Sequence, residues 1–314
     1  MLQRSRIPAN CIDRIKECPY SVDFGKGAVN VAGKNHNKTL NGALVSLRGQ
    51  CIDELTKNFF WRDYLDKPKE ERTPEEQALF TDNFKTAQVA NDGTEVSWHN
   101  EGYKELAVES SQYMLSVLKD CDEVYTDKYF DLLDFFISFP YVQIYNNTNG
   151  VKVAYNPRSE TEFTFGVSTD FSGVKDDTAY VIELKTGSSF GKDLETQVKI
   201  GCVAYAYYYP NLTHFVGMCY NPDGVTESEK IRVWKYTRKE LKEFAKELKI
   251  ILLSVFSSSQ ELYLQSGIDV NRIDWCNNCD CRRCPFSRKN KDNAEWQEKY
   301  KRYIDFLTDN NGGY

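Results

Sequence analysis

The chain has no apolar run approaching the roughly 20 residues that a membrane-spanning helix needs, so its sequence predicts no membrane partner. It also lacks a recognisable signal peptide, internal repeats and low-complexity tracts. We therefore expect a cytoplasmic protein from the interior of a bacterial or phage-infected cell. Acidic residues outnumber basic ones, with 46 Asp and Glu against 40 Lys and Arg. The net charge of −6 excludes a general affinity for nucleic acid, so any such contact must come from local basic patches.

The most informative segment of the sequence is a predicted β-hairpin. Two apolar runs at residues 163–174 and 179–186 flank the polar residues 175–177, whose composition is typical of a tight turn. If the turn centres on the last two of these, Asp170 lies directly opposite Glu183. Their side chains would then share one face of the hairpin, with Cβ atoms about 5 Å apart.

Two carboxylates placed in this way repel each other, and Glu183 also belongs to an apolar stretch in which burial penalises its charge. A hard divalent cation such as Mg²⁺ or Mn²⁺ bound between Asp170 and Glu183 would compensate both effects. The two-residue period of a strand directs Lys185 to the same face, where an ammonium can orient water or neutralise charge on a phosphate. The alternative is that these charges are merely solvated at the end of a strand.

A helix is predicted next, beginning after Gly191 and ending before Pro210. One polar residue and several small or aromatic ones fall on a single stripe of this helix at helical spacing, namely Gln197, Gly201, Ala204 and Tyr208. Such a stripe indicates either a surface that a nucleic-acid backbone approaches or a close packing of the helix on the sheet. Both interpretations remain open at this point.

These residues, in this order, resemble the PD-(D/E)XK nuclease superfamily, and within it the RecB-like exonucleases. The resemblance covers roughly residues 93–220 and is carried by Gly166, Asp170, Glu183, Leu184, Lys185 and Gln197. It implies an α/β fold with a restriction-endonuclease-like core, in which helices flank a mixed central sheet. It also implies a catalytic Mg²⁺ or Mn²⁺ held by Asp170, Glu183 and the carbonyl of Leu184, with Lys185 positioning the water and Gln197 contacting DNA.

Two departures from the family pattern concern the neighbours of these residues. Thr169 stands where the family usually has Pro, and Gly201 stands where it has Tyr, so Tyr205 or Tyr208 would have to contact the DNA. The family also implies a His or Glu on an upstream helix near the metal. His99 is the candidate for this position, with Glu101 in reserve. A histidine in a first helical turn can instead be a simple surface cap.

A second motif lies near the C-terminus, where four thiols stand close together at Cys276, Cys279, Cys281 and Cys284. In a reducing interior, clustered thiols bind metal more often than they form disulfides. A zinc ribbon needs a longer spacer between its two pairs than the single residue present here, and closely spaced thiolates followed by proline are familiar in iron-sulfur proteins. A 4Fe-4S cluster is thus the preferred interpretation, with zinc as the alternative.

A remote ligand for such a cluster is offered by Cys18, which precedes a proline. This arrangement resembles RecB-like nucleases with an iron-sulfur cluster, including AddB and the CRISPR-associated adaptation exonucleases. The resemblance implies Cys18, Cys276, Cys279 and Cys284 as ligands, with Cys281 as a possible substitute. Arg282 and Arg283 belong to a basic patch beside these thiols and are candidate DNA contacts. The other cysteines, among them Cys11, are expected to be buried as small apolar residues.

The organisation predicted from these patterns has three parts. Residues 1–92 form a helical N-terminal region with a cluster-ligand segment, residues 93–236 form the nuclease core, and residues 237–314 carry the C-terminal helices and the cysteines. The predicted helices are 40–64, 100–120, 126–138 and 237–265, and the predicted strands outside the hairpin are 140–146, 151–156, 213–220 and 230–236.

The function predicted from the motifs is that of a metal-dependent deoxyribonuclease. The site would suit an exonuclease on single strands or duplex ends, acting in DNA replication, recombination or repair. A helicase or another replication or recombination protein is a possible partner. The alternative is a nonenzymatic module that binds DNA or a helicase, with a degenerate nuclease fold stabilised by a cluster or by zinc.

Overall fold

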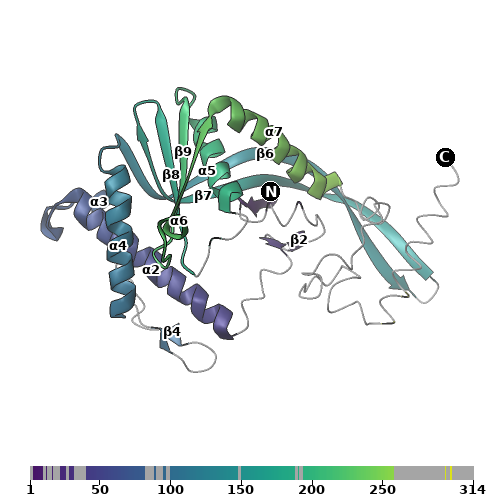
Figure 1. Ribbon diagram of the computed structural model, residues 1–314. Helices are drawn as coiled ribbons and strands as arrows, with labels where there is room; N and C mark the ends of the chain where they lie inside the picture. Colours follow the sequence, from purple (N-terminus) through teal and green to yellow (C-terminus); the bar gives the residue numbers. More distant parts are fainter. Residues whose placement is uncertain are drawn as a thin grey trace. The chain divides into compact units, whose positions relative to one another are not determined.

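The structure is a computed structural model, shown in Figure 1. It describes residues 3–9, 12, 16, 22–25, 28–31, 40–81, 88–89, 95–96, 100–147, 150–187, 190, 194–257, 294 and 298. The chain divides into two compact units. Unit 1 comprises Met1–His36, Asp131–Gly166 and Lys246–Tyr314, and unit 2 comprises Asn37–Phe130 and Val167–Ala245.

Unit 1 contains short strands from the N-terminal part of the chain. Strand β1 (Gln3–Pro8) pairs in parallel with residues 161–166 of β7 (Gly150–Lys175). Strands β2 (Val22–Gly25) and β3 (Ala28–Val31) form a separate antiparallel pair. Strand β7 continues into unit 2, as do β6 and α7.

Unit 2 contains most of the described helices and strands. They are α2 (Leu40–Leu65), η4 (Lys69–Glu71), α3 (Pro74–Gln77), β4 (Gln88–Val89), β5 (Glu95–Val96), α4 (Glu101–Leu118), β6 (Glu123–Asn147), β8 (Thr178–Leu184), α5 (Leu194–Tyr208), β9 (His214–Tyr220), α6 (Glu227–Lys230), β10 (Ile231–Thr237) and α7 (Arg238–Ser257). None of the helices in the described part of the chain is long and apolar enough to cross a membrane.

Strands β6, β7, β8, β9 and β10 are neighbours in that order in a mixed sheet, in which β7 also pairs with β1, whereas β4 and β5 form a separate antiparallel pair. The β7–β8 and β9–β10 pairs are antiparallel, and the β8–β9 pair is parallel. The crossover between the parallel strands β8 and β9 is made by α5. Helices and a mixed sheet place the fold in the α/β class, as predicted.

The predicted β-hairpin is confirmed by the pairing of β7 with β8. The register runs from Phe171 opposite Ile182 to Lys175 opposite Thr178, which leaves residues 176 and 177 as the turn. Asp176 has a φ of 54°, a left-handed conformation that Asp tolerates better than most residues. The predicted turn and the predicted register are therefore both correct.

Helices α2 and α4 pack together on one face of this sheet. Phe60 and Trp61 of α2 and Met114 of α4 share a buried apolar cluster with Phe171 of β7 and Ile182 of β8. The rings of Phe60 and Phe171 meet edge to face with centroids 5.4 Å apart. This cluster fixes α2 against the hairpin, which matters for the site described below.

Helix α5 packs on the opposite face of the sheet at close range. A side chain at Gly201 would bring its first carbon to 2.8 Å from Val181 Cγ1. Ala204 and Tyr205 are fully buried. The small residues of the α5 stripe therefore serve close packing on the sheet, which was one of the two interpretations of that stripe.

The prediction of a helix over residues 126–138 is wrong, because β6 runs through the whole segment. The segment alternates with a period of two where its burial is described, since Phe130 and Leu132 are both buried at 3% exposure. Apolar residues at 132, 133, 135, 136 and 137 fit a helical stripe equally well. Pattern alone did not separate the two periods, and pairing with β7 decides the outcome.

Candidate functional site

Four of the predicted site residues meet where the β7–β8 pairing ends. Asp170 and Glu183 are the residues next to Phe171 and Ile182, the pair of the hairpin farthest from the turn. The Asp170 Oδ2 atom accepts a hydrogen bond from the Leu184 backbone N–H at 2.8 Å. Glu183 Oε1 accepts hydrogen bonds from Lys185 Nζ at 2.6 Å and from Gln197 Nε2 at 2.5 Å.

These four side chains differ in their access to solvent. The Glu183 side chain is 8% exposed, whereas that of Lys185 is 38% exposed. Gln197 lies in the first turn of α5 and is partly buried. A buried carboxylate is thus connected to the surface by an ammonium group, which is a geometry that can receive an anion from solvent.

Two further charged residues, which sequence reasoning did not select, come from α2. Lys57 is 5% exposed, and its Nζ donates to Asp53 Oδ2 at 2.6 Å and to Asp127 Oδ1 at 2.7 Å. The other oxygen of the same carboxylate, Asp53 Oδ1, is buried, and no group in the described part of the chain donates a hydrogen bond to it. A buried carboxylate oxygen without a donor is costly.

The charges of Asp53 and of the two hairpin acids act on one another. Burial and then the charge of Asp170 raise the pKa of Asp53 to about 7, against the opposing effect of Lys57. Burial and the charge of Glu183 raise the pKa of Asp170. Burial also raises the pKa of Glu183, with Lys185 opposing and Asp53 adding to the shift. Each acid therefore disfavours the charge of another.

The cluster carries unbalanced charge when all its groups are ionised. Four carboxylates, those of Asp53, Asp127, Asp170 and Glu183, face two ammonium groups, those of Lys57 and Lys185, which leaves a formal charge of −2. Carboxylate oxygens are the donors that Mg²⁺ and Mn²⁺ prefer, so this set fits a hard divalent cation. Within the described residues, however, no three His, Cys, Asp or Glu side chains already surround one point as a metal site would.

The backbone that follows Lys185 is held by groups from other elements. Asp223 receives two hydrogen bonds from the Arg48 guanidinium of α2, at 2.8 and 2.5 Å, and one from the Gly187 N–H at 2.8 Å. Asn221 Nδ2 donates to the Gly187 carbonyl at 2.9 Å. Gly187 has a φ of 136°, which only glycine adopts readily. This clamp connects α2 to the end of β8.

The two tyrosines proposed as DNA contacts lie in different environments. Tyr205 is fully buried, and its hydroxyl donates to Ser172 Oγ at 2.7 Å, so its ring does not reach the surface. Tyr208 is 47% exposed and packs against Phe130, with ring centroids 5.2 Å apart. Of the two rings, only that of Tyr208 is accessible to a ligand in this conformation.

The remaining predicted site residues lie outside the described residues. These are His99, Cys18, Cys276, Cys279, Cys281, Cys284, Arg282 and Arg283. Glu101, the reserve candidate, is described: it opens α4, is exposed, and accepts a hydrogen bond from Lys104 at 2.6 Å. Among the cysteines expected to be buried, Cys51, Cys121, Cys202 and Cys219 are buried and free, as predicted.

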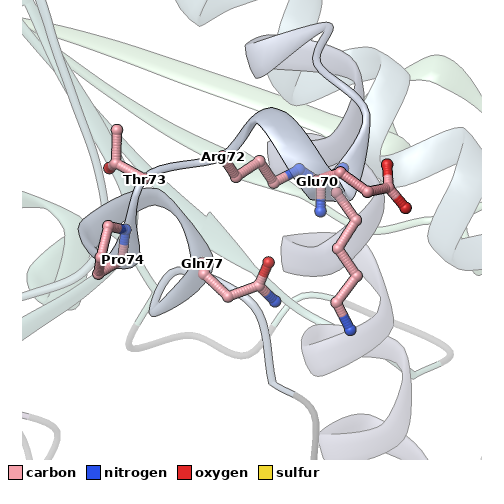
Figure 2. A pocket seen from close by; sticks show the side chains of 6 residues that line it. Glu70, Arg72, Thr73, Pro74 and Gln77 are labelled. Atoms are coloured by element: carbon pink, nitrogen blue, oxygen red, sulfur yellow. The ribbon is translucent and has the colours of Figure 1, made fainter.

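The surface hollow shown in Figure 2 is a separate feature beside η4 and α3. It is open and is lined by Lys69, Glu70, Arg72, Thr73, Pro74 and Gln77. Arg72 packs over the Phe80 ring at 4.0 Å, and Thr73 forms a capping box with Glu76. These polar groups are used to fold the connection itself, and none of them belongs to the carboxylate cluster.

Comparisons with known proteins add little to this description. No family model and no curated protein matches the chain. One solved structure, titled "Crystal structure of SSO0001", is similar at 13% identity and a TM-score of 0.20, over 68% of this chain and 88% of that one. A similarity this low carries no argument, so function has to be inferred from the site itself.

Proposed function

We propose that the protein is a metal-dependent deoxyribonuclease, acting as an exonuclease on single strands or duplex ends. The observation that supports this is the convergence of Asp170, Glu183, Lys185 and Gln197 at the end of one hairpin. A phosphodiester is an anion, and its hydrolysis needs positive charge placed beside the phosphate together with a positioned nucleophile. Carboxylates that hold a cation next to an exposed ammonium meet that requirement.

The roles of the residues follow from their contacts. Asp170 and Glu183 would hold Mg²⁺ or Mn²⁺, which when bound acts as a Lewis acid on the phosphate. Gln197 donates to Glu183 and so fixes the orientation of that carboxylate. The Leu184 N–H does the same for Asp170. Both acids therefore enter the reaction with their positions already determined.

Lys185 contributes charge to the reaction, and it does not act as a base. Burial would lower its pKa, but the charge of Glu183 and the hydrogen bond to it raise the pKa above the ordinary value. The side chain is therefore an ammonium at neutral pH. Its partial exposure lets it donate to a phosphate oxygen or to the attacking water.

The cysteine motif would add a structural element to this enzyme. We propose that Cys18, Cys276, Cys279 and Cys284 hold a 4Fe-4S cluster that connects distant parts of the chain, with Cys281 as a substitute ligand. Iron and sulfide analysis of anaerobically purified protein tests this. Stoichiometric zinc in colourless protein would contradict it without affecting the assignment of the carboxylate site.

Cleavage of defined DNA tests the proposed function directly. The full chain is incubated with linear and with circular single-stranded DNA in the presence of Mn²⁺. We expect the linear DNA alone to be degraded, and we expect Glu183→Gln to lose this activity. Glu195→Gln is the matched control, because Glu195 is exposed on the same helix as Gln197 and should leave the rate unchanged.

The other outcomes of this assay are equally informative. Degradation of both substrates would make the protein an endonuclease. Degradation of neither, combined with retention of DNA in a binding assay, would favour the nonenzymatic module instead. Activity that survives Glu183→Gln would place the reaction elsewhere in the chain.

A further inference from the structure

We propose that Asp53 of α2 is a third ligand for the divalent cation that Asp170 and Glu183 hold. This inference rests on the proposed function, because it extends the same site. Helix α2 would then contribute a metal ligand, at a position that no motif in the sequence marks. Its starting point is a single oxygen atom.

That atom is Asp53 Oδ1, which is buried and receives no hydrogen bond from the described residues. The two oxygens of this carboxylate differ sharply, because Oδ2 accepts a hydrogen bond from Lys57 at 2.6 Å. Folded proteins rarely leave a buried carboxylate oxygen without a partner. A divalent cation would provide that partner, because carboxylate oxygens are its preferred ligands.

The position of Asp53 is fixed by contacts of α2 one turn before it and one turn after it. Gly49, Asp53 and Lys57 are spaced four residues apart and so lie on one stripe of α2. At one end, Gly49 lies so close to Thr186 that a Cβ there would be 3.0 Å from its Oγ1. At the other end, Lys57 reaches Asp127. Asp53 lies between these two anchors.

The clamp described above holds the same stripe in register with the hairpin. Arg48, next to Gly49, binds Asp223, and Asp223 also binds the N–H of Gly187, two residues after Lys185. The turn of α2 that carries Asp53 is therefore tied to the segment that carries Lys185. This is the arrangement expected of a ligand that must be placed accurately.

A purely structural role for the Asp53–Lys57 ion pair explains less. Such a pair accounts for Oδ2, but it does not account for a buried Oδ1 next to Asp170 and Glu183, whose charges oppose its own. A divalent cation would change the formal charge of the cluster from −2 to zero. Without its excess negative charge, the cluster would no longer repel the negative charge of a phosphodiester.

Binding of Mn²⁺ in the absence of DNA tests the inference, measured by electron paramagnetic resonance on the full chain. We expect Asp53→Asn to weaken Mn²⁺ binding by at least about tenfold, since even groups that merely support a ligand cost 10- to 100-fold. We also expect the variant to lose the rise in melting temperature that Mn²⁺ gives the unmodified protein. Asp63→Asn is the matched control, because Asp63 is exposed on the same helix and pairs with its neighbour Arg62.

A second variant keeps the test decisive if Asp53→Asn folds poorly. Asp53→Glu retains the carboxylate and should retain more Mn²⁺ affinity than any neutral replacement. Unchanged Mn²⁺ binding in Asp53→Asn, or no Mn²⁺ binding by the unmodified chain, would overturn the inference.

The two proposals can fail separately. If Mn²⁺ binds through Asp53 but no DNA is cleaved, the function proposed above is wrong and the ligand assignment stands. If DNA is cleaved and Asp53→Asn keeps both affinity and rate, the ligand assignment is wrong and the function stands.

Discussion

The two ends of the β7–β8 hairpin treat their carboxylates in opposite ways. At the turn end, Asp177 is exposed and accepts hydrogen bonds from the hydroxyls of Thr213 and Thr178. The hydrogen bond with Thr213, followed by that with His214, lowers the pKa of Asp177. At the other end, burial raises the pKa of both Asp170 and Glu183.

The charged carboxylate of Asp177 therefore stabilises the fold, whereas those of Asp170 and Glu183 destabilise it. An acid whose folded pKa is lowered stabilises the protein when it is charged, and an acid whose folded pKa is raised costs stability when it is charged. Buried charges that destabilise one end of an otherwise regular hairpin are typical of functional sites.

The largest effect is expected on the rate of DNA cleavage, when Lys185 at the site end is replaced and Lys175 at the turn end serves as the comparison. Lys185→Ala should lower the cleavage rate by about 100-fold or more, the loss seen when one charge-stabilising donor is removed. Lys175 is exposed beside the turn of the same hairpin, so Lys175→Ala should keep the full rate. Steady-state cleavage of linear DNA measures both. Equal rates for the two variants would remove Lys185 from the mechanism.

The next effect concerns how each end is held. The turn end is held by hydrogen bonds with Asp122 and Thr213, whereas the site end is held by Asp223, which binds both Gly187 and Arg48. Asp223→Ala should lower the free energy of unfolding by about 1.5–3 kcal/mol, the range for hydrogen bonds to charged groups.

The control for that measurement lies on the same helix. The Arg62–Asp63 pair is exposed and joins sequence neighbours, so Asp63→Ala should change stability by less than about 0.5 kcal/mol. Denaturant titration of both variants gives the comparison. A loss for Asp223→Ala no larger than that for Asp63→Ala would mean that the site end does not need its clamp.

The hairpin and its acids could be predicted from the sequence because the information is local. The polar turn, the two-residue alternation and the position of Glu183 in an apolar strand all lie within a short segment, and they determine the register. Helix α5 was predictable for the same reason, since Pro210 marks the end of the predicted helix.

Asp53 and Lys57 could not be predicted in this way. A charged pair four residues apart on a helix is usually a solvated surface pair, and nothing in the sequence shows that α2 buries this one against the hairpin. Only the packing of Phe60 and Trp61 on β7 and β8 determines it. The close approach of Thr186 to Gly49 could not be predicted either, because a glycine inside a helix can have several structural reasons.

The contrast between the two ends also predicts that removing a buried charge at the site stabilises the protein. In buffer freed of divalent cations, Glu183→Gln should raise the free energy of unfolding by about 0.5–2 kcal/mol, because it removes a buried charge that burial and Asp53 disfavour. Gln retains an oxygen that can accept from Lys185. Glu195→Gln should leave stability unchanged. A destabilised Glu183→Gln variant would mean that the pair with Lys185 outweighs the cost of burial.

The smallest expected effect is at the turn, and it depends on pH. Because the folded pKa of Asp177 lies below the ordinary value of 3.8, its stabilising contribution is present above that pH and is lost as the pH falls through the folded pKa. Asp177→Asn should therefore have a lower free energy of unfolding than the unmodified protein, and the difference should stay constant between about pH 5 and pH 8. The difference should shrink below about pH 4. Denaturant titrations across this range measure it, and a difference that grows towards acid pH would show that the turn carboxylate is no better satisfied than those at the site.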